Sequence, residues 1–157
     1  YLSLGSNLGN RRINLEKAKF LLSKGNVKIL KSSRFYESKS WPNIKFPKFL
    51  NIVIKVQTNL SPYDLFNLIK NIEKKIGRKK TFKNYPRVCD IDIIDFDGKI
   101  VDKSDLQIPH PRLHQRNFVL IPLFEISKKW FHPVFKANIS KLIGKLSIID
   151  LMGIKLI

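Results

Sequence analysis

The stretch PRVCDIDIID, residues 86–95, places two aspartates, Asp90 and Asp92, in an otherwise apolar run. Side chains of an extended chain alternate between its two faces, so both carboxylates project to the same side, with their Cα atoms about 6.6 Å apart. Ile91 and Ile93 then point the other way, which predicts a strand of a buried sheet. Such a pair suits a divalent metal ion, although two solvated acids on an exposed sheet face would show the same spacing.

The acidic pair stands out because the chain is strongly basic. It contains 30 Lys and Arg against 12 Asp and Glu, and its net charge is +18. This balance indicates an anionic partner, which could be nucleic acid, a membrane surface or a phosphorylated small molecule. Lysines scattered over solvated faces would give the same balance, so the charge alone does not choose among these partners.

The length of 157 residues, 43% of them hydrophobic, predicts one well-packed domain over residues 1–157. The one cysteine, Cys89, excludes an internal disulfide and is expected to be a small buried residue rather than a nucleophile. Its isolation fits a reducing compartment, and the cytoplasm is expected. Every apolar run is soon broken by charge, so neither a signal peptide nor a membrane-spanning segment is expected. A monomer is expected.

The segments on both sides of the aspartate strand predict an α+β fold. Strands are predicted at residues 1–4, 27–37 and 49–58, and helices are predicted to begin after Asn10 and at Ser61-Pro62. In the strand 49–58, the residues Leu50, Ile52, Ile54 and Val56 share one face, while Phe49 and Asn51 lie on the other. With the aspartate strand the order is β-α-β-β-α-β, which predicts a sheet with helices on one face.

Residues 106–127, LQIPHPRLHQRNFVLIPLFEIS, are predicted to form a loop that leads into a packed helix. His110 and His114 are four residues apart, as zinc ligands on a helix would be, but the flanking prolines oppose a helix there and no acidic partner follows. No zinc site is therefore expected. The last segment, 139–157, predicts a short amphipathic helix and a closing strand or tail.

Five pieces of the chain together resemble the hydroxymethyl-dihydropterin pyrophosphokinases of folate biosynthesis. They are LSLGSNLGNR (2–11), SSRFYES (32–38) followed by FLN (49–51), IEKKIGR (72–78), PRVCDIDIIDFDG (86–98) and IPHPRLHQRNFVLIPLFEI (108–126). The most specific feature is PRxxDIDII followed, at this separation, by IPHPRLxxRxFVLxPL. The resemblance spans residue 2 to about residue 127. It implies a ferredoxin-like α+β core with extra C-terminal helices.

This resemblance also implies a reaction. The terminal diphosphate of ATP would pass as one unit to the hydroxymethyl oxygen of 6-hydroxymethyl-7,8-dihydropterin, with release of AMP. Asp90 and Asp92 would bind two Mg²⁺ ions that bridge the nucleotide phosphates. Paired metal ions can neutralise the attacking and leaving oxygens together, and Mg²⁺ prefers a few carboxylates combined with phosphate oxygens.

The nucleotide contacts of the family correspond to Glu73, Arg87, His110 and Arg116. Arg87 and Arg116 can donate paired hydrogen bonds to phosphate oxygens whose charge shifts during transfer, and Lys80 on the basic loop could add a movable charge. Function is favoured for Arg87 and Arg116, whereas the other three residues have a plainer alternative. Lys80 could be one more solvated lysine, Glu73 a solvent-facing helix residue and His110 a hydrogen-bonded turn residue.

For the pterin, the resemblance points to Asn51, whose amide can donate to and accept from the heterocycle, and to Phe118, which can stack on its face. Phe118 could instead be an ordinary core residue. Ser38 and Phe49 fall at further positions of the pterin pocket. Tyr85 approximates a position where many relatives carry tryptophan, and it would close the other face of the ring.

The sequence departs from the family at ESKSWPN, residues 37–43, which replaces a threonine-x-proline with a following glycine, and at Lys70, where glutamine is common. These changes affect loop details and substrate affinity rather than the reaction. The loops 39–48 and 78–86 are polar and lysine-rich, and they are predicted to be mobile without ligand and to close over the reacting groups.

Two functions of other classes also suit parts of the sequence. A ferredoxin-like sheet with surface aromatic residues suits single-stranded RNA, but no GFGFV-type run appears, and the aspartate pair would place negative charge where RNA must approach. Nucleic acid is therefore not an expected partner. A regulatory ligand-binding domain without catalysis would keep the pterin pocket but would need no metal-binding carboxylates.

Overall fold

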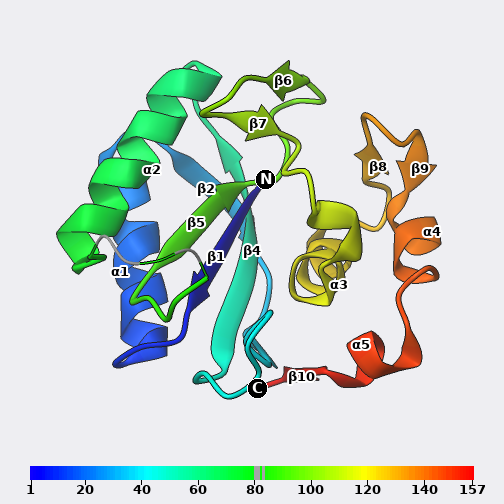
Figure 1. Cartoon of the computed structure of the whole chain (residues 1–157). Coiled ribbons are helices and arrows are strands. Elements are labelled where there is room, and N and C mark those ends of the chain that lie inside the picture. The colour runs from blue at the N-terminus through cyan, green and yellow to red at the C-terminus, as the bar shows by residue number, and fades with distance from the viewer. Residues whose placement is uncertain (80–81, 83) are drawn as a thin grey trace.

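The computed structural model describes residues 1–79, 82 and 84–157. Figure 1 shows a central sheet with helices on both sides. The first half of the chain runs through β1 (Leu2–Ser6), α1 (Arg11–Lys24), β2 (Lys28–Ser32), β3 (Tyr36–Ser38), β4 (Phe49–Gln57), α2 (Pro62–Ile76) and β5 (Asp90–Ile93). The second half contains β6 (Val101–Asp102), β7 (Gln107–Ile108), a 3₁₀ turn at Leu113–Gln115, α3 (Asn117–Ile126), β8 (Phe131–His132), β9 (Ala137–Asn138), α4 (Ile139–Ile143), α5 (Ile148–Met152) and β10 (Ile154–Leu156).

The main sheet has the strand order β10-β3-β4-β1-β5, and β2 also pairs with β4. β1 lies between β4 and β5 and is antiparallel to both. This arrangement with α1 and α2 as crossovers is the predicted β-α-β-β-α-β core, a ferredoxin-like α+β fold. The expectation that the aspartate stretch forms a strand of the sheet is confirmed, and the structure shows that this strand pairs with β1.

One face of the sheet packs on α1 and α2. Leu2, Leu4, Ile52, Ile54 and Ile91 are buried there with apolar residues of both helices. The helix ends follow local chemistry. The Asn10 side chain accepts a hydrogen bond at the start of α1, and the Ser61 side chain does so at the start of α2, where Pro62 follows. Gly77 ends α2 in the left-handed conformation, with φ of 108°.

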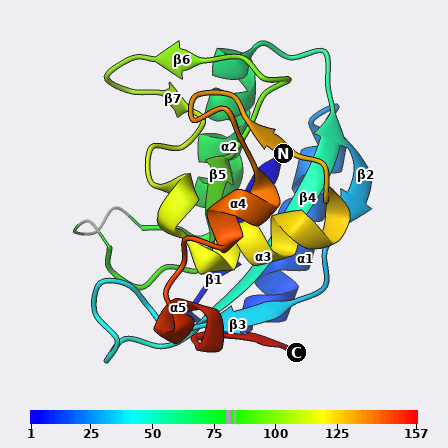
Figure 2. The ribbon, with the colours of Figure 1, turned by 90° about the vertical axis from the view of Figure 1, so that its right-hand side faces the viewer.

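The two helices of the β-α-β-β-α-β order share one face as predicted, and α3, the helix that follows the loop, covers the opposite face along β4. Val53 of β4 is buried there against Val119, Leu120 and Leu123 of α3. Figure 2 shows α3 and α4 in front of the sheet. Residues 50–54 of β4 are all buried, as expected of a strand that is covered on both faces.

The predicted strand 27–37 is also corrected, since it forms two strands separated by residues 33–35. Ser33 breaks the ladder because its hydroxyl accepts a hydrogen bond from the Val53 backbone N–H at 3.0 Å. The register with β4 also shifts between Ile29 and Lys31. A serine hydroxyl that takes a backbone partner competes with regular strand pairing.

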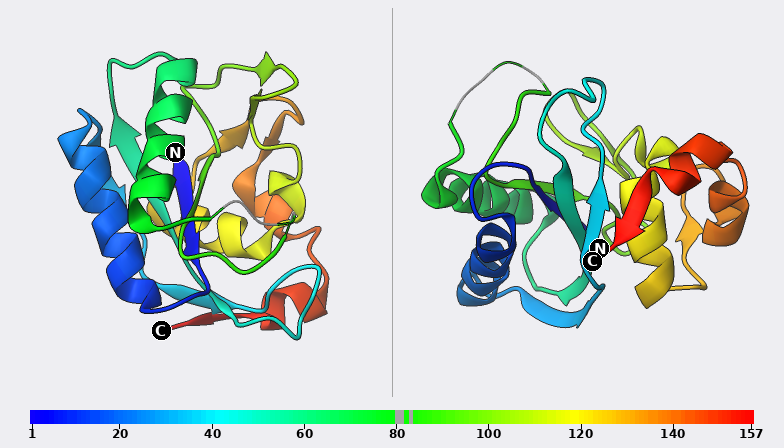
Figure 3. Two further views of the ribbon diagram at one scale, coloured as in Figure 1. Left: turned by 60° about the vertical axis from the view of Figure 1, so that its left-hand side comes forward. Right: turned by 90° about the horizontal axis from the view of Figure 1, so that it is seen from below.

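The C-terminal segment returns to the sheet. β10 pairs antiparallel with β3, with Ile154 opposite Ser38, and Figure 3 shows the two strands side by side. The predicted closing strand is confirmed, and two short helices, α4 and α5, precede it where one was predicted. Within the described part of the chain, every helix is too short or too polar to cross a membrane.

Candidate active site

The candidate site lies on the face of the sheet that α3 also covers. Because side chains alternate between the two faces of a strand, β1, β3, β4 and β5 each place residues on this face. Gly5 of β1 is the register partner of Asn51 in β4 and of Asp90 in β5, and Ser3 is the partner of Asp92. Side chains of register partners point to the same face of a sheet. These residues line one cavity, which also receives Lys39 and Trp41 from the segment after β3. The predicted site residues that line it are Ser38, Phe49, Asn51, Arg87, Asp90, Asp92, Arg116 and Phe118.

The aspartate pair projects as predicted. Ile91 and Ile93 are buried in the core toward α1 and α2, whereas the side chains of Asp90 and Asp92 remain 27% and 32% exposed. Each of the two carboxylates lies close to an arginine side chain. Arg116 Nη1 lies 3.0 Å from Asp92 Oδ2, and Arg87 Nη1 lies 3.4 Å from Asp90 Oδ2.

A third arginine, Arg78, binds Asp90 from the side of α2. Its Nη1 donates to Asp90 Oδ1 at 2.6 Å, and it also pairs with Glu73. Burial would raise the pKa of Asp90, but Arg87 and Arg78 more than offset it and hold that pKa below its ordinary value. Burial would likewise lower the pKa of Arg78, but Asp90 and Glu73 raise it. Asp90 is therefore ionised and positioned.

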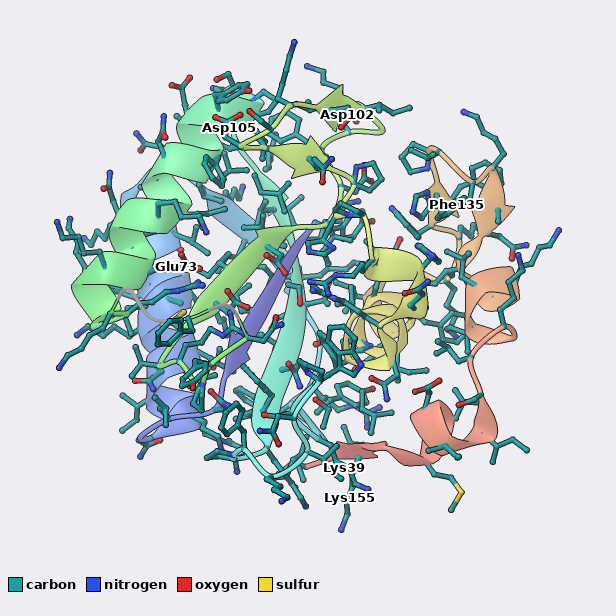
Figure 4. All side chains as sticks on the ribbon, in the orientation of Figure 1. Lys39, Glu73, Asp102, Asp105, Phe135 and Lys155 are labelled. Atoms are coloured by element: carbon teal, nitrogen blue, oxygen red, sulfur yellow. The ribbon has the colours of Figure 1, made fainter. Side chains whose placement is uncertain are left out.

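Glu73 lies behind the aspartate pair rather than in the cavity. It is 2% exposed, so its alternative interpretation as a solvent-facing residue is wrong. Figure 4 shows Glu73 on the side of α2 that faces β5. Its Oε1 accepts from the Ile91 backbone N–H at 2.8 Å, and its Oε2 lies 3.1 Å from Lys70 Nζ. Burial raises the pKa of Glu73, because lost hydration outweighs the attraction of Arg78 and Lys70.

The opposite side of the cavity offers amide and aromatic groups. Asn51 is buried, and its Nδ2 donates to Ser38 Oγ at 3.0 Å and to the Tyr36 carbonyl at 3.3 Å. These bonds fix the amide and identify Nδ2 as the atom next to Ser38. The guanidinium of Arg116 lies 5.5 Å from the ring centroid of Phe118, and that of Arg87 lies 5.7 Å from the ring centroid of Phe49.

Tyr85 also lies apart from this cavity. Tyr85 is 47% exposed and packs with Phe46, with ring centroids 5.4 Å apart. It therefore joins the segment before β5 to the loop 39–48, and its neighbour Asn84 lines the cavity instead. Lys80 lies outside the described residues, as do two further positions of the loop 78–86.

His110 borders a second cavity, next to the first. Asp92, Lys70, Phe66 and Arg112 line this cavity with it, so Asp92 borders both cavities. His110 Nδ1 accepts a hydrogen bond from the Arg112 backbone N–H at 3.1 Å, which leaves Nε2 as the N–H donor of a neutral ring. Burial lowers the pKa of His110, and Arg116 and Arg112 add to this although Asp92 opposes them.

The aspartate pair fits a divalent cation. Both residues offer only oxygen donors on one face of a strand, and Asp92 Oδ1 has no partner among the described side chains and backbone groups. In the described residues, no third His, Cys, Asp or Glu joins them as a cluster. The remaining ligands would thus be water or phosphate oxygens, which is the environment that Mg²⁺ prefers.

Sequence reasoning missed Arg78 and Gly5. Arg78 follows directly after the helix-ending Gly77, so the end of the IEKKIGR motif was the available signal. A Cβ atom at Gly5 would lie 3.2 Å from Asn51 Oδ1 and 3.3 Å from Phe49 Cδ1, so glycine keeps the floor of the cavity open. The pairing that makes this glycine necessary is visible only in the folded sheet.

The chain is similar to known proteins of one family. A family model described as 7,8-dihydro-6-hydroxymethylpterin-pyrophosphokinase (HPPK) matches residues 1–128. The chain is 44% identical over 147 residues to the folic acid synthesis protein fol1 of Pneumocystis carinii, covering 93% of this chain and 20% of that protein. It is 41% identical over 136 residues to the 2-amino-4-hydroxy-6-hydroxymethyldihydropteridine pyrophosphokinase of Aquifex aeolicus, covering 87% of this chain and 84% of that protein.

The chain therefore spans about a fifth of the length of the Pneumocystis relative and most of the Aquifex relative. Among solved structures, wild-type Plasmodium falciparum HPPK-DHPS with SDX-DHP is similar with a TM-score of 0.68 at 17% sequence identity. That similarity covers 92% of this chain and 42% of the other. It supports the fold.

Proposed function

The chain belongs to the 7,8-dihydro-6-hydroxymethylpterin-pyrophosphokinase family, the ATP-dependent pyrophosphokinases of folate biosynthesis, and from this membership we propose its reaction. It transfers the terminal diphosphate of ATP to the hydroxymethyl oxygen of 6-hydroxymethyl-7,8-dihydropterin, giving AMP and the pterin diphosphate. One observation carries the proposal. Asp92 borders both the cavity with Asn51 and Phe118 and the cavity with His110, so the carboxylates lie where two substrates would meet.

The transfer balances without a further reactant. The hydroxymethyl oxygen forms a bond to the β-phosphorus of ATP, and the bond from that phosphorus to the oxygen bridging the α- and β-phosphates breaks. AMP leaves with that electron pair, and the hydroxyl proton passes to solvent. The protein has little covalent chemistry to perform in such a transfer, so its contribution is position and charge.

The pterin is held by the amide and aromatic groups of the first cavity. Asn51 Oδ1, the atom not used by Ser38, accepts from the heterocycle, and Ser38 adds a hydroxyl at the same edge. Phe118 and Phe49 offer ring faces for stacking. Tyr85 would approach the other face only if the loop that carries it moves toward the cavity, since it now packs on Phe46.

The triphosphate is held by the basic groups around the aspartates. Arg87 and Arg116 now compensate the carboxylates, and they turn their free N–H groups to phosphate oxygens when ATP binds. His110 donates from Nε2, and Lys80 adds a further positive charge. Glu73 acts from behind, because its bonds to Arg78 and to the Ile91 N–H fix the strand between the two aspartates.

Asp90 and Asp92 are the residues that would hold two Mg²⁺ ions. Bound there, the ions would neutralise charge on the phosphate oxygens during transfer. The protein's own part is to keep both carboxylates ionised and on one face. The lowered pKa of Asp90 and the burial of Ile91 and Ile93 support that role.

We further propose that residues 1–157 act as a single, monomeric pyrophosphokinase unit in the cytoplasm. The groups proposed to bind both substrates come from this one chain. The free, buried Cys89 suits a reducing compartment. The acidic pair on β5, an edge strand of the sheet, disfavours RNA on that part of the sheet face.

Product identification tests the proposed function. The protein is incubated with ATP, Mg²⁺ and 6-hydroxymethyl-7,8-dihydropterin, and the products are analysed by ³¹P NMR and mass spectrometry. AMP and the pterin diphosphate are expected in equal amounts, and a 6-methyl analogue without the hydroxyl should yield no AMP. Formation of ADP with a pterin monophosphate, or no consumption of ATP, would contradict the proposal.

A further inference from the structure

Asn7, in the connection between β1 and α1, is a buried polar residue beside the candidate site. It is 3% exposed. Its Oδ1 accepts a hydrogen bond from the Arg87 backbone N–H at 2.7 Å, and its own backbone N–H donates to the Arg87 carbonyl at 3.1 Å. These two bonds hold both polar backbone groups of Arg87, so they fix where the Arg87 side chain starts.

The other end of the same amide binds a different segment. Asn7 Nδ2 donates to Ser40 Oγ at 3.2 Å and to the Pro47 carbonyl at 3.1 Å. Ser40 Oγ in turn donates to the Pro47 carbonyl at 2.6 Å. The three groups tie together the two ends of the loop 39–48, so Asn7 fixes the base of that loop.

The segment that carries Asn7 is itself anchored to α1. Asn14 Nδ2 donates to Ser6 Oγ at 3.2 Å and to the Leu8 carbonyl at 2.9 Å. The segment around Asn7 is thus also held from a helix of the core. Its amide uses one acceptor and two donors, a combination that neither aspartate nor alanine provides.

The two segments that Asn7 joins form different walls of the cavity. Lys39 and Trp41 extend from the loop on one side, and Arg87 reaches toward Asp90 from the other. We propose that Asn7 is a positioning residue for the diphosphate transfer, because one side chain sets the spacing between the phosphate-binding arginine and the loop beside the pterin pocket. The inference rests on the proposed function.

Replacement of Asn7 is expected to lower the turnover rate. A misplacement of about 1 Å between reacting groups can cost about 10²-fold in rate. Asn7→Ala is therefore expected to lower kcat about 10- to 100-fold, while KM for each substrate changes only a few-fold. Asn7→Asp keeps an acceptor for Arg87 but loses the donors to the loop, and Ser40→Ala removes one loop contact alone. Both should give smaller losses of kcat.

The matched control is Ser33→Ala. Ser33 is a buried serine with an accepted bond from Val53 and a donated bond to the Arg34 carbonyl, and it lies outside the cavity. It should lower the melting temperature yet keep the parental kcat of the folded protein. AMP release and thermal melting are measured for the parent, the control and the three variants, so a loss of stability is separated from a loss of position.

Hydrogen exchange adds a readout that a general loss of stability would not produce. Asn7→Ala should raise exchange both at the Arg87 N–H and in residues 40–47, Ser40→Ala only in residues 40–47, and Ser33→Ala in neither. If Asn7→Ala does not fold, Asn7→Asp and Ser40→Ala still test the loop contacts, since each should raise exchange in residues 40–47 and lower kcat below that of the control. A parent that releases no AMP contradicts the proposed function and this role with it. A parent that releases AMP, beside an Asn7→Ala variant with the kcat of the control or with only one segment loosened, contradicts this inference alone.

Discussion

Asn51 and Asp90 lie on opposite sides of one glycine, because each is the register partner of Gly5 in the strand next to β1. Two strand spacings separate them, about 9.6 Å across the sheet. The proposed pterin contact and the proposed metal ligand thus face the same cavity at a fixed distance. The space between them stays open because position 5 has no side chain.

Gly5→Ala is predicted to weaken pterin binding without destabilising the protein. The new Cβ would lie 3.2 Å from Asn51 Oδ1, so the amide must shift by a few tenths of an ångström. Replacing glycine within a strand gains roughly 0.5–1 kcal/mol of stability, which offsets this contact. Calorimetry should show a several-fold higher Kd for pterin and an unchanged Kd for an ATP analogue. Gly144→Ala, at the residue that follows α4, is the control, and parental pterin affinity in Gly5→Ala would refute the prediction.

Phe118→Ala and Asn51→Ala are predicted to weaken pterin binding about tenfold or more while ATP binding stays nearly intact. Both residues line the first cavity and neither lines the second. Titrating each ligand separately distinguishes the two sites. Phe131→Ala removes a half-exposed ring that lies outside the cavity and serves as the control. If both variants fold and bind pterin as the parent does, the pocket is wrongly assigned.

Most of the fold could be predicted from local chemistry. Asn10, Ser61 and Gly77 mark the helix ends where the structure has them. The alternation along β4 places Asn51 and Ile52 on opposite faces of the sheet. The break at Ser33 could not be predicted, because it depends on a hydrogen bond to Val53 in a different strand. The packing of α3 on the opposite face of the sheet could not be predicted either, because an apolar run does not show which element packs on it.

The site was predictable where two residues share a strand and not where they meet across the fold. Asp90 and Asp92 follow from a spacing of two residues. The buried position of Glu73 behind them depends on the Ile91 N–H and on Arg78, which follows the end of the same helix. The family resemblance named Glu73 but gave no means of telling a ligand contact from a support behind the strand.

The loop 39–48 is predicted to close over the bound substrates, and Trp41 should report it. Trp41 is 59% exposed and lines the cavity, with the Arg112 guanidinium 5.0 Å from its ring, whereas Trp130 is buried. Adding pterin and a non-hydrolysable ATP analogue should change the tryptophan fluorescence and protect residues 39–48 from hydrogen exchange. Trp41→Phe should abolish the fluorescence change. A change of equal size in that variant, with no protection of the loop, would exclude closure.

Cys89 is predicted to be unreactive in the native protein. It is fully buried, and burial raises the pKa of its thiol to about 12. A raised thiol pKa leaves almost no thiolate at pH 8, and thiolate is the reactive form. A thiol reagent should therefore label the protein only after unfolding in denaturant. Rapid labelling of the native protein at pH 8 would show that the segment just before β5 opens readily.

The central claim is that Asp90 and Asp92 hold metal against the phosphates, and the most direct measurement is AMP release as a function of Mg²⁺ concentration, with thermal melting on the same samples. Asp90→Ala and Asp92→Ala should each lower turnover by about 10²-fold or more, equivalent to several kcal/mol of transition-state stabilisation, with pterin affinity retained and melting temperature shifted by only a few degrees. Asp102→Ala, at an exposed carboxylate on β6, should behave like the parent. Near-parental AMP release at every Mg²⁺ concentration in both site variants would contradict the account.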